Sequence, residues 1–390
     1  MKVCFIAWEK FGVGGVSRAL TQTANALTNR HEVSIYCLRK APIIDAYGLN
    51  RSKIRMFHHE MNLYEKIRRS IVDVLTRRTP VFASRIGAYL YGFLRYTRSY
   101  KRKLINNLNA EKYDAVIFGS GFEDSLLLAI IKPQIPSTTR IISWSHASYD
   151  DYFSAKGKYF SKYFSYAVAN YYHRFDDIVV LSDYDCRKFL ENHSLRTKRI
   201  YNASSIYFAK YSTLQNKSFV YVGSLSKQKG VDLVIDAFAK FCKKKADWHL
   251  HVYGEGVLSS YITEQAVRNG IEHLVTLHGN VEDMSNEYIK HSILLFPSRC
   301  EGFGMVQVEA MSGGLPIIAS DIPVCKELMQ SSNAGKLFSS GSSDSLCSAM
   351  FALSQTDLNS LALNAIDFSK QFTVSNIMED WESMLQELIK

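Results

Sequence analysis

Short apolar runs recur along the first half of the chain, and a segment with helical spacing follows each of them. Lys2–Ala7 precedes a glycine-rich loop, and Ser17–Leu27 then carries apolar residues at positions 19, 20, 24 and 27, the period of a helix. Glu32–Leu38 is rich in β-branched and aromatic residues, which favours a strand. This order predicts a βαβ unit with parallel strands. Further strands are predicted over Ala115–Phe118, Arg140–Trp144 and Ile178–Leu181.

The same alternation restarts after Tyr201-Asn202. One amphipathic helix is predicted over Val231–Cys242, and strands are predicted over Phe219–Val222, His249–Tyr253, Val275–His278, Ile293–Phe296 and Pro316–Ala319. Serial β-α repeats build open parallel sheets whose ligands bind beyond the carboxyl ends of the strands. We therefore expect an α/β protein with two doubly wound, Rossmann-like domains that face a cleft. Their boundaries are 1–200 and 201–371, and a C-terminal helix within 372–390 packs back toward the first domain.

Charge is distributed unevenly between the two halves. The 390 residues carry a net charge of +10, but residues 1–200 hold 32 basic and 17 acidic side chains, whereas the remainder holds 15 and 20. The segment 51–103 alone holds 14 basic and 3 acidic side chains. Such an asymmetry indicates an anionic partner for the first half: a membrane surface, a nucleic acid or an acidic glycan.

The basic segment is also amphipathic, because Leu63, Ile67, Ile71, Val74 and Leu75 share one helical face. One interpretation is a helix that packs on its own sheet with a solvated basic rim. The other, which we favour because the charge exceeds what solubility requires, is a peripheral contact with an anionic membrane. The residues expected there are Arg68, Arg69, Arg77, Arg78, Phe82, Tyr89 and Phe93.

No run of about 20 apolar residues exists in the chain, so no spanning helix is expected. The seven cysteines are scattered singly, which is typical of reduced thiols in a cytosolic protein. These observations predict a cytoplasmic protein that sits peripherally on the inner face of the membrane.

The strongest chemical signal lies in Pro297–Gly314, "PSRCEGFGMVQVEAMSGG". If a helix begins near position 303, its first amides and the positive end of its dipole face any ligand there. Gly302 and Gly304 let an anionic ligand approach the backbone. Glu301 would stand at the mouth and accept hydrogen bonds from sugar hydroxyls, and the deeper Glu309 would accept from a second diol.

These residues belong to a longer set of recognisable motifs. "VGSLSKQKGVDLVIDAF", "VYGEG", "LHGNV" and "FPSRCEGFGMVQVEAMSGGLPIIAS" follow one another, and the first half adds the Gly14-Gly15 loop, Tyr201-Asn202 and "SWSHASYDDYF". In this order they resemble glycosyltransferase family 4, with its Glu-x7-Glu motif. The family consists of retaining enzymes of the GT-B fold that use nucleotide-sugar donors. The resemblance covers most of the chain and is weakest from about 41 to 110.

The resemblance implies a role for each matched position. The catalytic residues would be Glu301 and His146. The donor sugar would lie against Glu301, Gly302, Phe303 and Gly304, and its diphosphate against Lys229, Gly304 and Met305. The nucleotide would be bound by Glu309 through the ribose and by the loops at Gly254, Gly256 and Val281. Donor and acceptor would meet at Gly14 and Gly15.

One departure from the family pattern affects the diphosphate site. The family commonly has arginine directly after the glycine at position 223, and this chain has Ser224. Serine has neither the charge nor the paired N–H donors of a guanidinium group. Lys227 in the same loop is therefore the expected second cation beside Lys229. The departure leaves an alternative open, in which the chain is a non-catalytic partner subunit that binds a sugar-nucleotide. A nucleic-acid-binding protein is the other alternative, although no recognition helix or stacking motif accompanies the basic charge.

The resemblance and the residues together predict a retaining hexosyl- or N-acetylhexosaminyltransferase. Its donor is a nucleotide-sugar, with a UDP-sugar favoured, and its acceptor is a glycan or lipid-linked acceptor in the assembly of cell-surface polysaccharide or glycoconjugate. A helix N-terminus with a lysine can stabilise a leaving diphosphate. We therefore expect no metal and no other cofactor. We also expect no nucleic-acid partner, because the chain shows no recognition helix or stacking motif.

Overall fold

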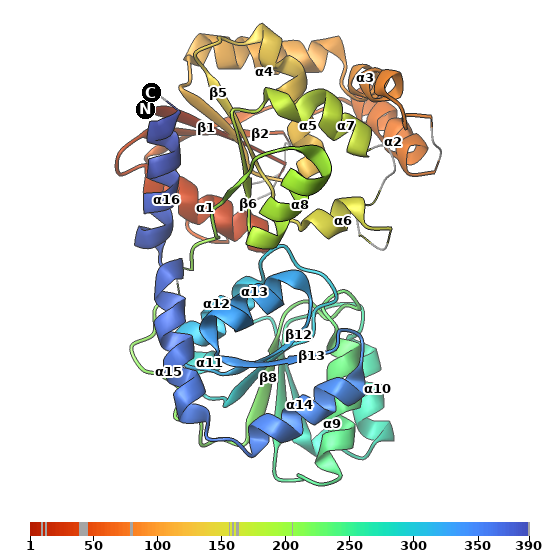
Figure 1. Cartoon of the computed structure of the whole chain (residues 1–390), viewed down its shortest axis with the longest axis vertical. Coiled ribbons are helices and arrows are strands. Elements are labelled where there is room, and N and C mark those ends of the chain that lie inside the picture. The colour runs from red at the N-terminus through yellow and green to blue at the C-terminus, as the bar shows by residue number, and fades with distance from the viewer. Residues whose placement is uncertain are drawn as a thin grey trace. The chain divides into compact units, whose positions relative to one another are not determined.

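The structure is a computed structural model that describes residues 1–388 except 9–10, 12–13, 39–45, 79–80, 156, 158–159, 161–163 and 205. It divides into two compact units, each an α/β layer structure with its own parallel sheet (Figure 1). Unit 1 holds Met1–Ala203 and Val374–Lys390, and unit 2 holds Ser204–Thr373. These boundaries lie close to those expected at 200/201 and 371/372.

Unit 1 is built on seven parallel strands in the order β3-β2-β1-β4-β5-β6-β7. Their interior is continuously apolar because helices cover both faces of the sheet; residues 3–7 of β1, for example, are wholly buried. The strands are β1 (Lys2–Ala7), β2 (Glu32–Cys37), β3 (Ile54–His58), β4 (Ala115–Phe118), β5 (Arg140–Trp144), β6 (Asp177–Val180) and β7 (Lys198–Arg199). The helices are α1 (Gly15–Leu27), α2 (Leu63–Arg78), α3 (Arg85–Arg95), α4 (Arg98–Glu111), α5 (Phe122–Ile131), α6 (Tyr149–Phe153), α7 (Phe164–Tyr171), α8 (Asp183–His193) and α16 (Val374–Glu387).

Unit 2 repeats this plan with six parallel strands in the order β10-β9-β8-β11-β12-β13. The strands are β8 (Ser218–Val222), β9 (His249–Tyr253), β10 (Val275–Gly279), β11 (Ile293–Phe296), β12 (Ile317–Ser320) and β13 (Gly335–Phe338). The helices are α9 (Val231–Cys242), α10 (Ser259–Arg268), α11 (Ser285–Tyr288), α12 (Met305–Ser312), α13 (Pro323–Ser332), α14 (Ser343–Ser354) and α15 (Leu358–Ser369).

The strand order of each sheet reverses once. The reversal falls between β1 and β4 in unit 1 and between β8 and β11 in unit 2. Successive crossovers leave in opposite directions at such a switch point, so a crevice opens at the carboxyl ends of its two strands. In unit 2 the two loops at this crevice are 223–230, after β8, and 297–304, after β11.

The sequence pattern predicts ten of these strands and misses β3, β7 and β13. All three are edge strands, and β3 buries only its first residue, Ile54, within a segment that reads as basic and amphipathic. The helix of the chemical motif is also displaced. It begins at Met305, with Gly304 as its N-cap, rather than near position 303.

The C-terminal helix α16 packs on unit 1. The indole of Trp381 is wholly buried and meets the ring of Trp144 with a centroid distance of 4.9 Å. Glu382 accepts a hydrogen bond from His31 of unit 1 at 2.9 Å. The last helix of the chain is therefore part of the first α/β layer structure, beside α1 (Figure 1).

Candidate functional site

The crevice of unit 2 brings together two residues that lie 72 positions apart in the sequence. The ammonium group of Lys229 is 2.5 Å from Oε1 of Glu301. Ser298 donates a second hydrogen bond to the same oxygen at 2.8 Å. The Glu301 side chain is 10% exposed and that of Lys229 is 32% exposed, so the pair is open to solvent at one side. The switch point thus carries a cation, a carboxylate and a helix N-terminus.

Two glycines determine the packing of the loops at the crevice. A Cβ on Gly230, where φ is +73°, would be 2.1 Å from the carbonyl oxygen of Pro297. Gly304, where φ is +83°, caps α12, and a Cβ there would be 2.8 Å from the ring of Phe296. Since L-residues avoid this backbone region and have no space here, glycine is required at both positions.

Arg299 holds the two loops against each other, and the sequence analysis did not single it out. Its guanidinium forms a bidentate pair with Asp232 at 2.8 Å for each nitrogen. It also donates to the carbonyl of Lys227, while its backbone N–H donates to the carbonyl of Gln228 at 2.8 Å. Ser224 and the side chain of Lys227 remain exposed in this loop. Arg299 lies within the motif at 297–314, but the motif gave it no role, because its partners are set by the approach of the two loops.

Glu309 occupies the second turn of α12 and is only 2% exposed. Tyr288 of α11 donates a hydrogen bond to its carboxylate at 3.1 Å. Met305 and Val306 supply the first amides of α12, ahead of the Gln307 N–H that bonds Gly304. Glu309 therefore lies beneath the crevice, whereas these amides and Glu301 line its mouth. Gly302 and Phe303 are buried between them.

The loops expected at the nucleotide meet at the carboxyl ends of β8, β9 and β10. Gly254 donates to the carbonyl of Gly279 at 2.7 Å, and Leu225 donates to the carbonyl of Glu255 at 2.9 Å. Gly256 lies against Leu225, where an added Cβ would be 2.5 Å from its carbonyl oxygen. Val281 is 37% exposed in the loop after β10. Backbone atoms therefore dominate this rim.

His146 lies at the equivalent rim of unit 1, just after β5. Its ring packs on Trp144 at a centroid distance of 4.3 Å, and Trp144 is backed by Trp381 of α16. Burial lowers the pKa of His146 to about 3, so the imidazole is neutral at neutral pH. Neither ring nitrogen has a hydrogen-bond partner within the described part of the chain. A neutral imidazole of this kind can donate to or accept from a ligand.

The Gly14-Gly15 loop begins α1 at the same rim. Gly14 is the N-cap, and its N–H donates to the hydroxyl of Tyr47 at 2.9 Å. A Cβ on either glycine would meet none of the described atoms within 4 Å. Among the described residues, none therefore fills the space beside this loop.

Comparison with known proteins finds a family model for each half of the chain. Residues 13–203 match the family model described as Glycosyltransferase Family 4, and residues 216–356 match the model described as Glycosyl transferases group 1. The chain belongs to the family 4-like glycosyltransferases. An uncharacterized glycosyltransferase of Methanocaldococcus jannaschii is 30% identical over 238 residues. The matched region is 60% of this chain and 64% of that relative, so the chain spans slightly less than two thirds of its length.

Another relative matches over a shorter region of sequence, and solved structures match in fold. A lipopolysaccharide core mannosyltransferase of Rhizobium meliloti is 24% identical over 178 residues, which are 42% of this chain and 51% of the relative. The structure of Anabaena HepE in complex with UDP and glucose superposes with a TM-score of 0.75 and 19% identity over 99% of this chain and 100% of that chain. This likeness confirms the GT-B fold expected from the sequence.

The residues of this chain that were expected at a membrane fall into two groups, exposed and buried. Tyr89 and Phe93 of α3 are 67% and 46% exposed, as a surface contact requires. Phe82 is 2% exposed and packs against the ring of Tyr91 at a centroid distance of 5.7 Å, so its prediction as an interfacial anchor is wrong. The turn before α3 uses this phenylalanine to fill the core.

The prediction for Arg69 is wrong for a similar reason. Its guanidinium pairs with Asp124 at 2.6 Å and lies 4.0 Å from the centre of the Trp8 indole, so it faces the protein interior. Arg68 is half-buried and donates to the carbonyls of Phe93 and Leu94. The side chains of Arg77 and Arg78 lie outside the described residues.

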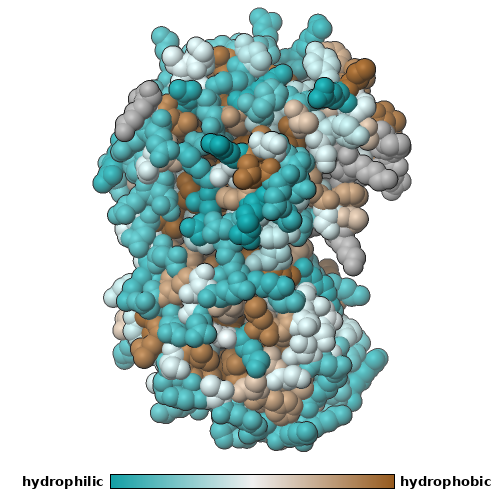
Figure 2. All heavy atoms as spheres, in the orientation of Figure 1, coloured by the Kyte–Doolittle hydropathy of each residue, from teal (hydrophilic) through white to brown (hydrophobic). Residues whose placement is uncertain are grey.

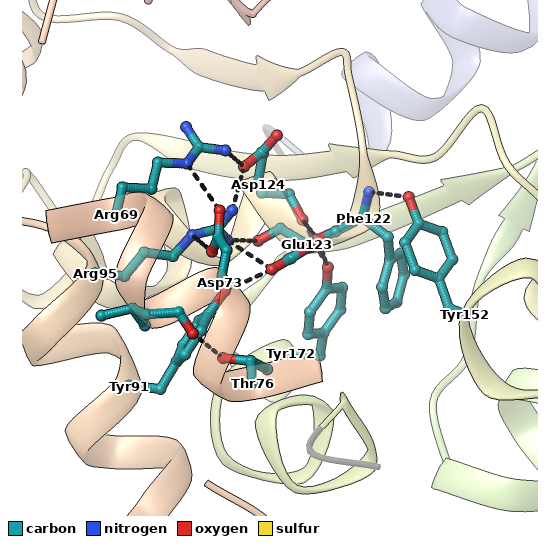
Figure 3. A network of polar contacts seen from close by, with 12 residues as sticks. Arg69, Asp73, Thr76, Tyr91, Arg95, Phe122, Glu123, Asp124, Tyr152 and Tyr172 are labelled. Atoms are coloured by element: carbon teal, nitrogen blue, oxygen red, sulfur yellow. Dashed lines mark hydrogen bonds and ion pairs between the residues drawn. The ribbon is translucent and has the colours of Figure 1, made fainter. Parts of the chain in front are cut away.

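Arg69 is one member of an ion-pair cluster that we call the Arg95 network (Figure 3). Its members, from α2, α3 and α5, are Arg69, Asp73, Arg95, Glu123 and Asp124. The guanidinium of Arg95 is 2% exposed and contacts Asp73 at 3.0 Å, Glu123 at 3.2 Å and Asp124 at 3.1 Å. Tyr91 adds a hydrogen bond to Glu123 at 2.6 Å. The network fixes both helices to the N-terminal end of α5.

Asp183 and Asp185 stand two apart at the start of α8, a spacing that can place two carboxylates on one metal ion. Asp185 is 2% exposed, and its oxygens accept from the backbone N–H of Tyr149 at 2.7 Å and from the Ser182 hydroxyl at 2.6 Å. Asp183 pairs with Arg199 at 3.2 Å. Both carboxylates serve the capping and packing of α8.

A groove of about 410 Å³ lies elsewhere in unit 2, at the starting ends of β8 and β9, and Glu301 and Lys229 do not line it. Its wall holds a cluster of imidazoles. His251 and His278 share a hydrogen bond of 3.0 Å, and His291 shares one of 3.1 Å with Tyr253. Within the described residues, no group of three potential ligands is arranged to hold a metal ion.

This cluster makes the stability of unit 2 depend on pH. Burial lowers the pKa of His291 to about 3 and that of His251 to about 4, each with help from neighbouring histidines. Histidine in the unfolded chain titrates near 6.5, so the unfolded state binds more protons between these values. We expect unit 2 to lose about 2 kcal/mol of stability through His291 alone as the pH falls from 7 to 5.

The measurement is urea unfolding at pH 7, 6 and 5, followed by hydrogen exchange in peptides of β9, β10 and β11. The His291→Gln variant should show a shallower dependence on pH over this range. A wild-type stability that is constant in these strands would contradict the prediction.

Proposed function

We propose that the chain transfers a sugar from a nucleotide-sugar, with a UDP-sugar favoured, with retention of configuration and without a metal ion. The observation that carries the proposal is the Lys229–Glu301 pair at the switch point of unit 2, beside the N-terminus of α12. A ligand with both a diphosphate and a sugar satisfies this combination, because the lysine and the amides attract the anion while the carboxylate accepts from sugar hydroxyls. The UDP and glucose bound by HepE support this choice of donor.

In the proposed reaction the bond between the anomeric carbon and the diphosphate oxygen breaks. The acceptor oxygen bonds to the same face of that carbon and passes its proton to the departing diphosphate oxygen. Negative charge develops on the leaving diphosphate, and Lys229 and the amides of Met305 and Val306 stabilise it from fixed positions. Glu301 orients the sugar, and neutral His146 hydrogen-bonds to a sugar hydroxyl. Glu309, beneath the crevice, holds α11 against α12 through Tyr288 and in this proposal also accepts from the ribose.

We propose a glycan or lipid-linked acceptor, in the assembly of cell-surface polysaccharide or glycoconjugate, held by unit 1. The lipopolysaccharide core mannosyltransferase among the relatives supports this class. We also place the protein peripherally on the inner face of the membrane, since segment 51–103 is strongly basic. Within the described residues, no helix is long and apolar enough to cross a bilayer.

The test is a panel of UDP-, GDP-, ADP- and dTDP-sugars added to the purified protein, with thermal shift and release of the nucleotide diphosphate as readouts. One donor should raise the melting temperature and be turned over when a lipid-linked glycan extract is present. Stabilisation by a donor without turnover under any acceptor condition would instead favour the non-catalytic partner subunit, to which the departure at Ser224 points. A chain that no donor stabilises would contradict the proposal.

Lys229 is expected to carry the diphosphate charge in the absence of an arginine at position 224. The Lys229→Ala variant should lose about 1.5–3 kcal/mol of donor or transition-state interaction, the scale of a hydrogen bond to a charged group. Isothermal titration with the nucleoside diphosphate checks this. The matched control is Lys227→Ala, whose side chain is exposed in the same loop.

The Ser224→Arg variant restores the family residue and should leave diphosphate affinity unchanged or improve it, because an arginine adds a bidentate donor. Unaltered binding in Lys229→Ala together with a loss in Lys227→Ala would transfer the role to Lys227. Unaltered binding in both variants would show that the crevice does not hold a diphosphate.

A further inference from the structure

Helix α2 turns its apolar face to solvent. Leu63, Ile67 and Ile71 are 73%, 52% and 55% exposed, and Val74 is 47% exposed. These positions recur every three or four residues, so they form one continuous stripe along the helix. An ordinary surface helix buries such a stripe against its own core. The interpretation of α2 as a helix packed on its own sheet through this face is therefore wrong.

The opposite face of α2, which packs on the protein, is mostly polar. Thr97 donates to Glu65 at 2.6 Å, and Arg69 and Asp73 belong to the Arg95 network. Val72 is the apolar residue buried on this side, at 4% exposure. Specific ion pairs and hydrogen bonds thus fix the orientation of the helix (Figure 3). The apolar stripe is outward because the inward positions have dedicated partners, and no rotation of α2 could hide it without breaking them.

The stripe continues across the neighbouring turn and helix. Ile86 and Tyr89 of α3 are 75% and 67% exposed, and Val81 between the helices is 62% exposed. Figure 2 shows brown atoms over this part of unit 1, at the upper right. We call the whole set the α2–α3 face; it comprises Leu63, Tyr64, Ile67, Ile71, Val74, Leu75, Val81, Ile86, Tyr89, Leu90 and Phe93. Exposed apolar side chains gathered on two adjacent helices mark an interaction site.

Cations gather at one end of the α2–α3 face, around Phe93. Arg98 and Lys101 of α4 each lie 5.9 Å from the centre of the Phe93 ring, and Arg68 donates to the Phe93 carbonyl. In the part of the chain that the structure describes, none of these three side chains forms an ion pair with a carboxylate, and the charged neighbours of Lys101 are Arg68 and Arg98. Burial lowers the pKa of Lys101, and the neighbouring Arg68 and Arg98 lower it further. Three cations held together in this way suit an anionic group.

We propose that the α2–α3 face inserts into the interfacial region of an anionic lipid bilayer, with Arg68, Arg98 and Lys101 at the headgroup phosphates. An apolar face flanked by aromatic residues and cations matches the three layers that a bilayer surface presents in order: acyl chains, interface and anionic headgroups. The inference deepens the proposed membrane location and does not depend on the donor site. It adds the outward apolar stripe of α2 to the basic and aromatic residues expected there, so that apolar burial contributes most of the contact.

A second copy of the chain fits this face less well. A two-fold interface through the α2–α3 face would place the same patch of each copy against itself. Since the cluster of Arg68, Arg98 and Lys101 lies at one end of the face, a two-fold axis through the middle of the face would set it against apolar residues at the other end. Those residues leave its charge without a partner, whereas anionic headgroups neutralise it. The lipid surface is therefore the occupant favoured by charge.

The test is flotation with vesicles of phosphatidylcholine alone and with 30% phosphatidylglycerol, at low and high salt. Wild type should bind the anionic vesicles and keep part of that binding at high salt, because apolar burial is not screened. The double variant Ile67→Glu/Ile71→Glu should lower the partition constant at least tenfold in either salt. The matched control Leu190→Glu, on α8 of the same unit and 53% exposed, should bind as wild type does.

Other outcomes decide against the inference. Equal binding of the double variant and wild type, or an equal loss in Leu190→Glu, would overturn it. So would concentration-dependent dimerisation that only the double variant abolishes, since the face would then join two copies. The thermal unfolding midpoint of the double variant without ligand checks that it is folded, and it should match wild type. This check uses no donor, so a failure of the donor proposal leaves the membrane test intact.

Discussion

Replacing Glu301 with alanine is expected to lower kcat at least about 100-fold while the fold survives. Losses of 100- to 1,000-fold are typical when one preorganised polar partner of a reacting group is removed. Glu301 is such a group, because Lys229 and Ser298 fix its carboxylate at the switch point, 10% exposed and aimed at the crevice. Stability should change by at most about 1 kcal/mol, since Lys229 is one-third exposed and can be hydrated without its partner.

Steady-state transfer assays with the donor identified by the panel check this expectation. The matched control is Glu264→Ala on α10, an exposed carboxylate of the same unit, which should retain wild-type turnover. The Glu301→Gln variant separates charge from hydrogen bonding at the same position. Near wild-type turnover in Glu301→Ala would show that the reacting sugar lies elsewhere.

Replacing Arg95 with leucine is expected to destabilise unit 1 by about 3–5 kcal/mol, the usual cost of breaking a buried ion pair from one side. The guanidinium is 2% exposed and contacts three carboxylates, from Asp73, Glu123 and Asp124. Leucine fills part of the volume but leaves these carboxylates close together without their central cation. Burial already raises the pKa of Asp73, so one carboxylate would take up a proton more readily in the variant.

The measurement is urea unfolding followed separately for each unit by hydrogen exchange, because a two-unit chain has no single unfolding free energy. Protection should fall in α2, α3 and α5 and stay unchanged in unit 2. The matched control is Arg98→Leu, an exposed arginine of α4, which should change stability by less than about 0.5 kcal/mol. A destabilisation in Arg95→Leu as small as in the control would show that the network contributes no stability.

The sequence by itself determined the architecture and predicted the rim that carries the candidate site. Buried parallel strands such as residues 3–7 and 293–296 read as apolar runs because helices cover both of their faces. Glycine-rich loops follow them at the carboxyl ends, so the candidates Glu301, Lys229 and Gly304 could be placed on one rim before any contact was known. Edge strands such as β3 were missed because their half-exposed pattern lacks this signal.

Only the tertiary structure decided which of these residues touch and which way α2 faces. Lys229 and Glu301 are 72 residues apart, and Arg299 meets Asp232 only because Gly230 lets two loops approach. Periodicity located the apolar stripe of α2 but not its direction, since burying either face satisfies the same helical repeat. The partners of Arg69 and Asp73 lie on α3 and α5, and their ion pairs turn the stripe outward. Long-range pairing of this kind leaves no mark in local sequence.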